Sequence, residues 1–353
     1  MTKQYSNLWE RITSFGNLYA AWQAASLGKR SKPEVATFEL SLEPNLLAVQ
    51  RSLLSGTYHP SGYHSFLIQD PKRRWVSAAP FLDRVVHHGL IRVLEPIYEP
   101  TFIDSSYANR KGRGTHLALG HAQQGIQQNA YVLQCDIKQF FPSVDHAILM
   151  SILAKKITCQ PTLDLCETIL ASGDKILADE YSMTYFSGDD LLASERARGL
   201  PIGNLTSQFW ANVYMNELDQ LVKRELKCKT YLRYVDDFLL FSDSKKTLWE
   251  WKSAMREKLN SLRLTMHEES STVYPTKNGI PFLGFNLFAT HRRLKNRNAR
   301  AFEHRYREWQ VGFAKGELTL EQITQRVQGW VAHAKHADTQ GLREIILSKP
   351  WKT

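Results

Sequence analysis

The sequence predicts an α+β fold, and three observations support that class. Residues 231–241 comprise two short apolar stretches joined at two adjacent aspartates, which predicts a hairpin of two strands. Residues 131–135 form a third apolar stretch, which predicts a buried strand that ends at Asp136. Elsewhere, apolar residues recur at helical spacing, for instance over residues 205–222. Strands mixed with longer amphipathic helices favour a sheet with helices packed against it.

The composition bounds the class of protein. The chain has 353 residues, 43% of them hydrophobic, which is enough for a sizeable core and two or three subdomains. The net charge of +10 favours a polyanionic partner, because Lys and Arg release condensed counterions from phosphates; a charged, solvated surface is the alternative. The four cysteines show no metal-ligand spacing and indicate a reducing compartment. No apolar run approaches the ~20 residues of a membrane span, and a signal peptide's apolar core is missing. We therefore expect a cytoplasmic protein with no membrane partner.

The N-terminal third predicts helices followed by a hairpin. Apolar residues recur at helical spacing over residues 8–22, and a second helix is expected over residues 46–54. A strand is then expected to lead into the basic turn at residues 70–75. The basic loop at residues 110–115 precedes a helix that Thr115 would cap, and its glycines and cations suit an anion at the helix N-terminus. The alternative for both basic segments is a solvated loop.

The C-terminal half predicts further helices and one segment with little regular structure. Residues 171–198 carry few periodic cues and are expected to form an insertion between strands. Helices are expected over residues 205–222 and 245–261. Residues 291–315 contain eight Lys or Arg and two Glu, a net charge of +6, and apolar positions follow over residues 318–330. This pattern predicts helices with one basic face and one packed face, with a solvated basic helix as the alternative.

Three aspartates stand where strands are expected to end. A two-residue hairpin turn favours Asn-Gly or Asp-Gly, because its backbone needs positive φ, so Asp236 and Asp237 are a poor choice for folding alone. The two anions also repel each other unless a cation neutralises them. Asp136, about 100 residues upstream, adds a third carboxylate. Hard oxygen ligands suit Mg²⁺, which keeps some of its waters, so three carboxylates suffice for a site; a solvated acidic turn is the alternative.

Several motifs, in the expected order, resemble those of reverse transcriptases. The segment after the first predicted catalytic strand carries Pro201-Ile202-Gly203 and Ser207-Gln208, where most members have Pro-Gln-Gly and Ser-Pro. This variant is typical of the reverse transcriptases of diversity-generating retroelements. Residues 80–88 and 106–116 are similar to the same family, and the resemblance extends over about residues 8–307.

The resemblance implies a right-hand polymerase within the α+β class. Residues 1–125 would form an N-terminal extension and the fingers, residues 126–290 a palm made of an antiparallel sheet with helices, and residues 291–353 a small helical thumb. The segment around residues 171–198 would be a finger-side insertion in the palm. Too few residues follow the thumb helices for a ribonuclease H, integrase or endonuclease domain, so we expect any integration to use other proteins.

The implied activity is that of an RNA-directed DNA polymerase, a nucleotidyltransferase that extends a primer 3′ hydroxyl on an RNA template. The resemblance assigns catalysis to Asp136, Asp236 and Asp237, with Asp237 contributing least, and it adds Ile137 to the metal site. Two Mg²⁺ ions, or Mn²⁺ in their place, would lie ~3.5–4 Å apart and clamp the attacking and leaving oxygens of an in-line displacement.

The resemblance also implies a set of residues that bind the incoming nucleotide, which are Lys72, Arg73, Arg74, Phe140, Phe141, Ile202 and Gly203. Arg74 is the first choice for the triphosphate. Phe141 stands where the family places an aromatic gate against a ribose 2′ hydroxyl, and a core aromatic is the alternative. Ile202 has no donor or acceptor in its side chain. This predicts weak discrimination among bases and a share in the family's misincorporation opposite template adenine.

The template and primer are expected to contact a second set of residues, which are Arg110, Lys111, Arg113, Ser207, Gln208, Leu283, Gly284, Arg292, Arg293 and Arg297. Residues 281–285 resemble the short hairpin that grips the primer strand, with an ordinary buried turn as the alternative. No general acid is assigned, because Glu268 and Glu269 stand where relatives often carry a Lys or Arg. Lys277 is one candidate.

Three other clusters receive no functional role. The pair Asp189-Asp190 lacks flanking apolar strands, which predicts a solvated loop. His87 and His88 cannot share a helix face, which favours packing or capping. His333 and His336 could share one, but no third ligand is evident near them in the sequence, so both are expected at the surface.

The resemblance finally implies a biological role. A bacterial or phage-encoded enzyme would make error-prone cDNA from a retroelement template RNA and diversify a target gene by mutagenic retrohoming. Its expected partners are the template RNA, the cDNA or primer, and a small, basic, oligomeric accessory protein. One alternative is a stand-alone bacterial reverse transcriptase that acts in phage defence. Another is an inactive polymerase-shaped RNA-binding scaffold, against which the intact acidic trio argues.

Overall fold

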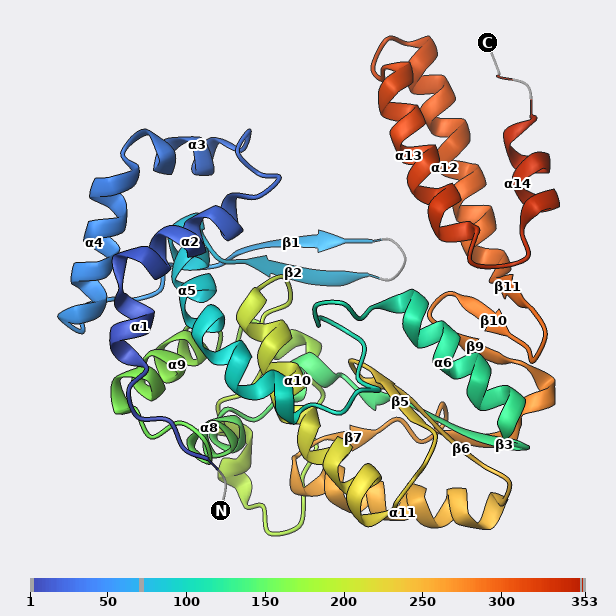
Figure 1. The fold of residues 1–353 in the computed structure, drawn as a ribbon, viewed down its shortest axis with the longest axis horizontal. Helices are drawn as coiled ribbons and strands as arrows, with labels where there is room; N and C mark the ends of the chain where they lie inside the picture. The colour runs from blue at the N-terminus through green and yellow to red at the C-terminus, as the bar shows by residue number, and fades with distance from the viewer. Residues whose placement is uncertain (1–2, 70–72, 350, 352–353) are drawn as a thin grey trace.

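The structure is a computed structural model that describes residues 3–69, 73–349 and 351. At its centre lies a four-stranded antiparallel sheet with the strand order β5-β6-β3-β8, which confirms the α+β class (Figure 1). Its strands are β3 (Tyr131–Cys135), β5 (Tyr231–Tyr234), β6 (Asp237–Ser242) and β8 (Thr272–Pro275). Strand β3 pairs with both β6 and β8, so the predicted strand at residues 131–135 lies inside the sheet.

Helices form most of the remaining structure. The N-terminal helices are α1 (Trp9–Thr13), α2 (Phe15–Ser26), α3 (Pro33–Leu40) and α4 (Leu42–Leu54). The central helices are α5 (Phe81–Tyr98), α6 (Thr115–Gln128), α7 (Phe140–Ser143), α8 (His146–Ala154), α9 (Gln160–Ser172), α10 (Leu205–Gln220), which continues into the π-helical turn η4 (Leu221–Glu225), and α11 (Lys245–Ser261). The C-terminal helices are α12 (Asn296–Ala314), α13 (Leu320–Ala334) and α14 (Gln340–Leu347). None of the helices in the described part of the chain is both long and apolar enough to cross a membrane.

The predicted helices are largely confirmed, with one division. The helix expected over residues 245–261 is α11, and the one expected over residues 46–54 is the C-terminal part of α4. The helix expected over residues 8–22 is instead two helices that meet at Ser14. The Ser14 hydroxyl accepts a hydrogen bond from the backbone N–H of Asn17 (3.3 Å) and so caps α2.

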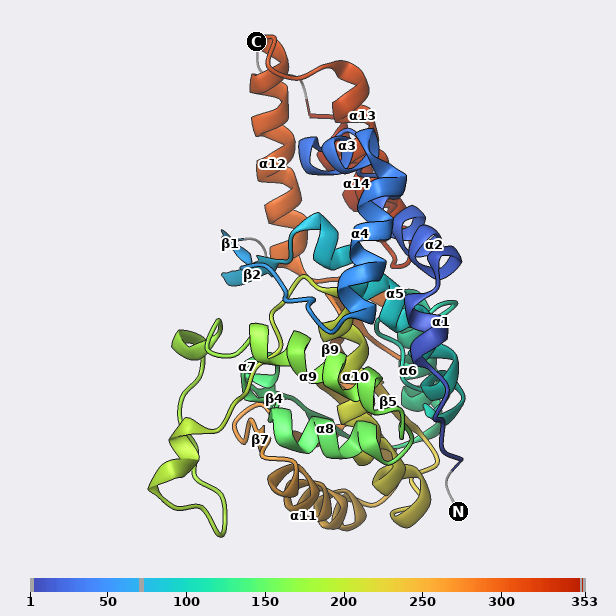
Figure 2. The same ribbon diagram turned by 90° about the vertical axis from the view of Figure 1, so that its left-hand side faces the viewer.

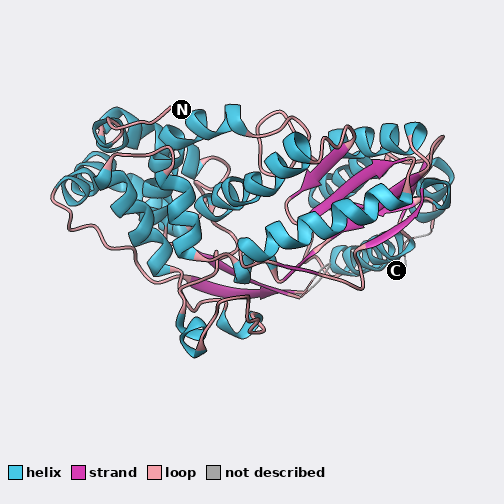
Figure 3. Ribbon diagram, turned by 90° about the horizontal axis from the view of Figure 1, so that it is seen from below, coloured by secondary structure: helices cyan, strands magenta, loops and turns pink. Residues whose placement is uncertain are grey.

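Side chains of the central sheet alternate between two hydrophobic clusters, as the two-residue period of a strand requires. On β3, Val132 packs into one cluster and Leu133 into the other, and Leu239 and Leu240 of β6 divide in the same way. Helix α6 covers the first face, and α11 covers the second. Figure 3 shows the strands between these layers of helices. The sheet is buried on both faces, which explains why its strands are continuous apolar runs.

Smaller sheets and short turns complete the fold. The hairpin of β1 (His64–Ile68) and β2 (Arg74–Ala78) extends toward the C-terminal helices in Figure 1. The other small strands are β4 (Ile137–Lys138), β7 (Thr265–Met266), β9 (Ile280–Phe282), β10 (Phe285–Leu287) and β11 (Arg292–Leu294). The 3₁₀ turns are η1 (Glu99–Thr101), η2 (Ala178–Glu180), η3 (Leu191–Glu195) and η5 (Thr276–Asn278).

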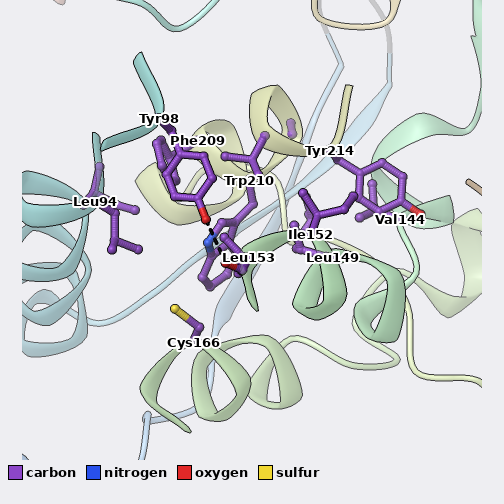
Figure 4. Packing of buried hydrophobic residues seen from close by; sticks show 14 of the residues in the cluster. Leu94, Tyr98, Val144, Leu149, Ile152, Leu153, Cys166, Phe209, Trp210 and Tyr214 are labelled. Carbon is purple, nitrogen blue, oxygen red and sulfur yellow. Dashed lines mark hydrogen bonds between the residues drawn. The ribbon is translucent and has the colours of Figure 1, made fainter. Parts of the chain in front are cut away.

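The largest hydrophobic cluster joins the N-terminal helices to α8, α9, α10 and the sheet. In Figure 4, Tyr98 of α5 lies beside Phe209 of α10, and its hydroxyl donates to the backbone oxygen of Leu153 (3.1 Å). The C-terminal helices have a separate small cluster, in which the rings of Phe302 and Trp330 stack with centroids 3.7 Å apart. The described residues therefore form three hydrophobic clusters, one on each face of the sheet and a small one among the C-terminal helices.

The segment predicted as an insertion begins with the last two residues of α9; beyond Ser172 its regular elements are the 3₁₀ turns η2 and η3, and it projects from the body in Figure 2. The prediction of a solvated loop for its acidic pair is wrong for Asp189. Both carboxylate oxygens of Asp189 accept from the Arg263 guanidinium (2.6 and 2.7 Å), which lowers the pKa of Asp189 to about 2. Asp190 caps η3 by accepting from the N–H of Leu192 (3.0 Å). Asp189 thus ties the segment to Arg263, whereas Asp190 stabilises a turn within it.

Candidate active site

The acidic hairpin turn lies one residue earlier than predicted. Tyr234 pairs with Asp237, so Val235 and Asp236 occupy the turn and Asp237 begins β6. The positive φ falls on Val235 (+59°) and on neither aspartate. A β-branched residue is a genuine outlier in this region, and such strain concentrates at functional sites. The predicted turn at Asp236 and Asp237 is therefore corrected, and its strain belongs to the neighbouring valine.

Strand pairing brings the third aspartate to this hairpin. Cys135 pairs with Phe238, so Asp136 and Asp237 are the next residues along the two strands. The backbone oxygen of Asp136 accepts from the N–H of His267 (2.9 Å), which fixes the chain just beyond β3. Burial raises the pKa of the Cys135 thiol to about 12, so this thiol stays neutral beside the acids.

All three predicted catalytic aspartates line one cavity of about 600 Å³. The other lining residues are Arg73, Arg74, Trp75, Ile137, Gln139, Phe140, Phe141, Pro142, Leu177, Glu180, Ile202, Tyr234, Val235 and Leu283. The cavity thus joins the end of the β1–β2 hairpin, the turn after β3, the projecting insertion and the β5–β6 turn. Lys72, which was also predicted to bind nucleotide, lies outside the described residues.

The donor set of the cavity fits a hard divalent cation held only in part by protein. Carboxylate oxygens are the ligands that Mg²⁺ prefers, and this ion usually keeps waters and takes oxygens from substrate phosphates. Within residues 3–69, 73–349 and 351, no group of three or more His, Cys, Asp and Glu side chains is arranged to hold a metal by itself. The aspartates would therefore share an ion with phosphate and water oxygens.

The two phenylalanines after β4 have different surroundings. Phe140 is 2% exposed and belongs to the main core, whereas Phe141 is half-buried. Their rings meet edge to face with centroids 5.3 Å apart. Gln139, which precedes them with φ +50°, accepts from the N–H of Ser182 (2.9 Å) and so ties the insertion to this turn.

The segment of Ile202 is bonded to strand β2. The N–H of Ser77 donates to the backbone oxygen of Ile202 (2.8 Å). Gly203 has φ +113°, and a Cβ there would lie 2.8 Å from Cγ1 of Val76. Gly203 is not among the residues that line the cavity. Its positive φ and its close packing against β2 explain why a glycine stands at this position.

Sequence reasoning missed the role of Asn204. Its side chain is buried, its Nδ2 donates to the backbone oxygens of Ser77 (2.8 Å) and Pro201 (3.0 Å), and its Oδ1 accepts from the N–H of Ala79 (3.0 Å). Asn204 therefore locks β2 to the start of α10. Its position before a predicted helix signals a cap, but no side-chain cap is present, and no local pattern signals a tie to β2.

The basic loop before α6 differs from the prediction in two places. The Arg110 side chain is 4% exposed and donates to Glu99 (2.7 and 2.9 Å) and to the backbone oxygens of Ile103 and Ser106, so it braces the loop from within. Thr115 is the first residue of α6 and does not cap it; its hydroxyl lies 3.1 Å from the Tyr234 hydroxyl. Arg113 pairs with Asp104 (2.8 Å), and Lys111 is exposed.

The predicted primer hairpin is the turn between β9 and β10. Leu283 and Gly284 both have positive φ (+44° and +89°), and Leu283 lines the cavity. A Cβ at Gly284 would lie 2.9 Å from Nδ2 of Asn298, which donates to the backbone oxygen of Gly284 (3.2 Å). The tip is therefore anchored to the start of α12.

The remaining predicted template and primer residues lie away from the cavity. Ser207 is buried within α10, and Gln208 is half-buried. Arg292 donates to Oε1 of Gln123 on α6 (2.8 Å), whereas Arg293 and Arg297 are exposed. Of the three arginines, Arg293 on β11 and Arg297 on α12 are exposed, and the Arg293 guanidinium lies over the Phe288 ring, 5.6 Å from its centroid.

The segment that lacks the expected cation faces helix α11. Glu268 pairs with Lys252 (2.9 Å) and Arg256 (2.7 Å), which lowers the pKa of Glu268 chiefly through the bond from Arg256. Lys277 is exposed and does not line the cavity. The geometry therefore assigns no general acid.

The two C-terminal histidines have a third neighbour that the sequence concealed. His116 of α6 stacks on His336, with ring centroids 3.4 Å apart, and lies 5.9 Å from His333. Burial and the neighbouring His336 and His333 lower the pKa of His116. The three rings form a contact between α6 and the C-terminal helices, 217 residues or more apart in sequence.

Comparison with known protein families identifies the family of this chain. The family described as "Reverse transcriptase (RNA-dependent DNA polymerase)" matches residues 69–287, more than half of the chain. The chain therefore belongs to the reverse transcriptase family.

Individual proteins are similar to parts of the chain. It is 29% identical over 190 residues to the group II intron-encoded protein LtrA of Lactococcus lactis subsp. cremoris, which is 53% of this chain and 29% of LtrA. It is 25% identical over 289 residues to protein YkfC of Escherichia coli, which is 70% of this chain and 72% of YkfC. It is 30% identical over 95 residues to the mitochondrial nuclear intron maturase 1 of Arabidopsis thaliana, which is 27% of this chain and 13% of the maturase. The chain thus spans less than a third of LtrA.

Proposed function

We propose that this chain copies RNA into DNA at the cavity lined by Asp136, Asp236 and Asp237. The observation that supports this most directly is the convergence of these acids. The end of β3 and the β5–β6 turn, about 100 residues apart, bring three carboxylates to one cavity that two arginines also line. Family membership supports the same reaction.

The arrangement of elements supports a right-hand polymerase. Residues 1–125 would form the N-terminal extension and the fingers, with the β1–β2 hairpin as the finger that reaches the cavity. Residues 126–290 would form the palm around the central sheet, and residues 291–353 the thumb. In Figure 1 the hairpin reaches from the N-terminal helices toward the C-terminal ones, which is consistent with a finger that faces the thumb.

The residues of the cavity have separate tasks in this proposal. Bound Mg²⁺ or Mn²⁺ would lower the pKa of the primer 3′ hydroxyl and neutralise the triphosphate. The guanidinium groups of Arg73 and Arg74 would bind the phosphates, which planar cations suit. The Phe141 ring would exclude a ribose 2′ hydroxyl, and Leu283 would hold the primer end. Catalysis would then rest on positioning and charge compensation.

We further propose that the enzyme serves a diversity-generating retroelement. Its Pro201-Ile202-Gly203 and Ser207-Gln208 motifs support this assignment. The template would be an RNA of the element, and a small, basic, oligomeric accessory protein would be a partner. Action in phage defence is the alternative. A variable target gene with an imperfect repeat near the coding gene would favour the first role.

The catalytic assignment predicts the outcome of primer extension on an RNA template. Asp136→Ala and Asp236→Ala should lower synthesis at least about 10²–10³-fold, the cost of removing one group that stabilises transition-state charge. Asp237→Ala should cost less. Binding of the RNA–primer duplex should stay close to that of the wild type. The matched control is Asp190→Ala, which removes a carboxylate that caps η3 and leaves the cavity intact; near-normal synthesis by either of the first two variants would refute the assignment.

The role assigned to Ile202 predicts an error spectrum. Ile202→Gln adds a donor and an acceptor to the cavity wall, so errors opposite template adenine should become rarer. Sequencing cDNA made on a defined RNA measures the rate for each template base. Ile202→Leu, which stays apolar, should keep the wild-type spectrum. An unchanged adenine error rate in Ile202→Gln would contradict the hypothesis.

A further inference from the structure

The side chain of Arg233 on β5 lies beside the acidic turn and contacts it directly. It is fully buried, and all five of its N–H groups are engaged. Nε and Nη2 donate to the two carboxylate oxygens of Asp219 on α10, at 2.7 to 3.1 Å. Nη2 also donates to Oγ of Ser106 (3.1 Å). Nη1 donates to Oδ1 of Asn212 (3.2 Å) and to the backbone oxygen of Val235 (3.0 Å).

The ion pair beneath the turn is sealed from water. Asp219 is 0% exposed, and its Oδ1 also accepts from the Tyr231 hydroxyl (2.7 Å). Burial alone would lower the pKa of Arg233, but attraction to Asp219 outweighs it and the pKa is raised. A charge pair as enclosed as this one is costly to desolvate and often no better for stability than apolar residues. Stability alone therefore does not account for an ion pair at this place.

The bond to Val235 supplies that reason. Val235 holds φ +59°, a conformation that favours glycine and is strained for a β-branched side chain. The residue on one side of it is Tyr234, which ends β5, and on the other side is Asp236. Strained residues persist only where their surroundings over-determine them. Here the bond from Nη1 of Arg233 fixes the Val235 carbonyl, and hence the direction in which the chain leaves β5.

The same arginine is bonded to the segment that leads into the basic loop. Its backbone N–H donates to the oxygen of Ser105 (2.9 Å), and its backbone oxygen accepts from the N–H of Tyr107 (3.0 Å). Asn212, its partner on α10, donates to the oxygen of Ala108 (2.9 Å). The guanidinium therefore sits where α10, residues 105–108 and the acidic turn meet.

We propose that Arg233 is a positioning residue for catalysis, which holds the strained Val235 turn so that Asp236 and Asp237 face the cavity. The inference rests on the proposed function of the cavity. It predicts that the loss of activity on replacing Arg233 depends on the strain at Val235. If the ion pair were purely structural, that loss would be the same whichever residue occupied position 235.

A double-mutant cycle between the two residues tests this dependence. Arg233→Lys keeps the charge but has fewer donors, so it loses the bond to Val235. It should lower kcat and raise the Mg²⁺ concentration at half-maximal activity, each by about 10–100-fold, the scale of losing a group that orients a metal ligand. Val235→Gly removes the strain, because glycine adopts positive φ freely. In the V235G background, the effect of R233K on both quantities should shrink at least about tenfold.

Arg110→Lys is the matched control. Arg110 is also a buried arginine with a carboxylate partner and two backbone acceptors, but it does not contact the turn. The effect of R110K on kcat and on the Mg²⁺ midpoint should be the same with and without V235G. If V235G relieves R110K as much as R233K, or relieves neither, the proposal is overturned.

A second variant covers the case in which R233K does not fold. Asn212→Ala leaves both partners of the Arg233–Asp219 pair in place. It removes the acceptor of the second N–H of Nη1, so Nη1 is held less firmly toward the Val235 oxygen. It should raise the Mg²⁺ midpoint in a way that V235G again relieves, and an unrelieved or absent shift overturns the proposal. Inactivity of the wild-type chain, or full activity of D236A, would instead refute the function of the cavity itself, so the two failures are distinguishable.

Discussion

At the scale of single residues, Phe140 and Phe141 show how position decides between core and site. The two are adjacent and chemically identical, and the resemblance assigns the gate to Phe141, with a core aromatic beside Phe140 as the alternative. Phe140 is buried in the main cluster, and Phe141 is half-buried in contact with it; both line the cavity with part of their surface. The half-buried ring has more surface to offer a ligand.

This difference predicts opposite phenotypes for two matched substitutions. Phe141→Ala should raise incorporation of ribonucleotides relative to deoxynucleotides about tenfold or more, since a ring that meets a 2′ hydroxyl is lost; a steric effect of 1–3 kcal/mol corresponds to about 10–200-fold. Phe140→Ala should instead lower the free energy of unfolding by about 3–5 kcal/mol. Competition assays with both nucleotide types and denaturant unfolding measure the two effects. Unchanged sugar selectivity in F141A would contradict the gate.

The conformation and contacts of single residues were the features that the sequence predicted least well. The acids of the trio stand out because paired aspartates are poor turn formers. The strained residue is nevertheless Val235, because pairing of Tyr234 with Asp237 sets the turn, and that register depends on the whole sheet. Arg110 resembles a ligand-binding arginine in sequence and is buried in the structure, since its partners Glu99 and Ile103 are brought to it by the fold.

At the scale of elements, helix α6 meets helix α13 and the turn that follows it through three histidine rings. His116 faces His333 and His336 of the C-terminal helical region, and Arg292 of β11 is the other cation near it. Burial is the first cause that lowers the pKa of His116 and of His333 from their ordinary value of 6.5. Neutral rings can stack at this contact, whereas protonated ones would repel each other and Arg292.

The contact is therefore expected to weaken in acid. A histidine with a lowered folded pKa stays neutral in the folded protein while the unfolded chain takes up a proton. The stability of the contact is thus complete above pH 6.5 and is lost as the pH falls below that value. Hydrogen-exchange protection factors of α13 should be lower at pH 5.5 than at pH 8. His116→Phe should abolish much of this difference, whereas His304→Gln, at an exposed position of α12, should retain it; equal pH dependence in H116F and the wild type would contradict the interpretation.

Elements were the level that the sequence predicted best. The helix at residues 245–261 and the strand at residues 131–135 follow from their periodicity and apolar runs, which are local properties. The division of the first helix at Ser14 depends on a single cap. The partner of His333 and His336 is His116, which lies in a different predicted segment, so only the packing of α6 against the C-terminal helices reveals it.

At the scale of the whole molecule, the α+β class is confirmed and family membership is established. The order of strands in the sheet, β5-β6-β3-β8, is not apparent from the sequence, because no local pattern states which strands pair. That order is what joins the end of β3 to the β5–β6 turn. The cavity therefore arises from the topology of the sheet, and its walls come from segments that are separate in the chain.

One link between distant parts of the chain has a mechanical consequence. Ser77 and Ala79, near the end of β2, are hydrogen-bonded to Ile202 and Asn204. A movement of the hairpin should therefore be coupled to a movement of the stretch before α10. If Arg73 and Arg74 move inward when a triphosphate binds, Ile202 should move with them. Phosphate binding and base discrimination would then be coupled, so a change that loosens the hairpin should also lower fidelity.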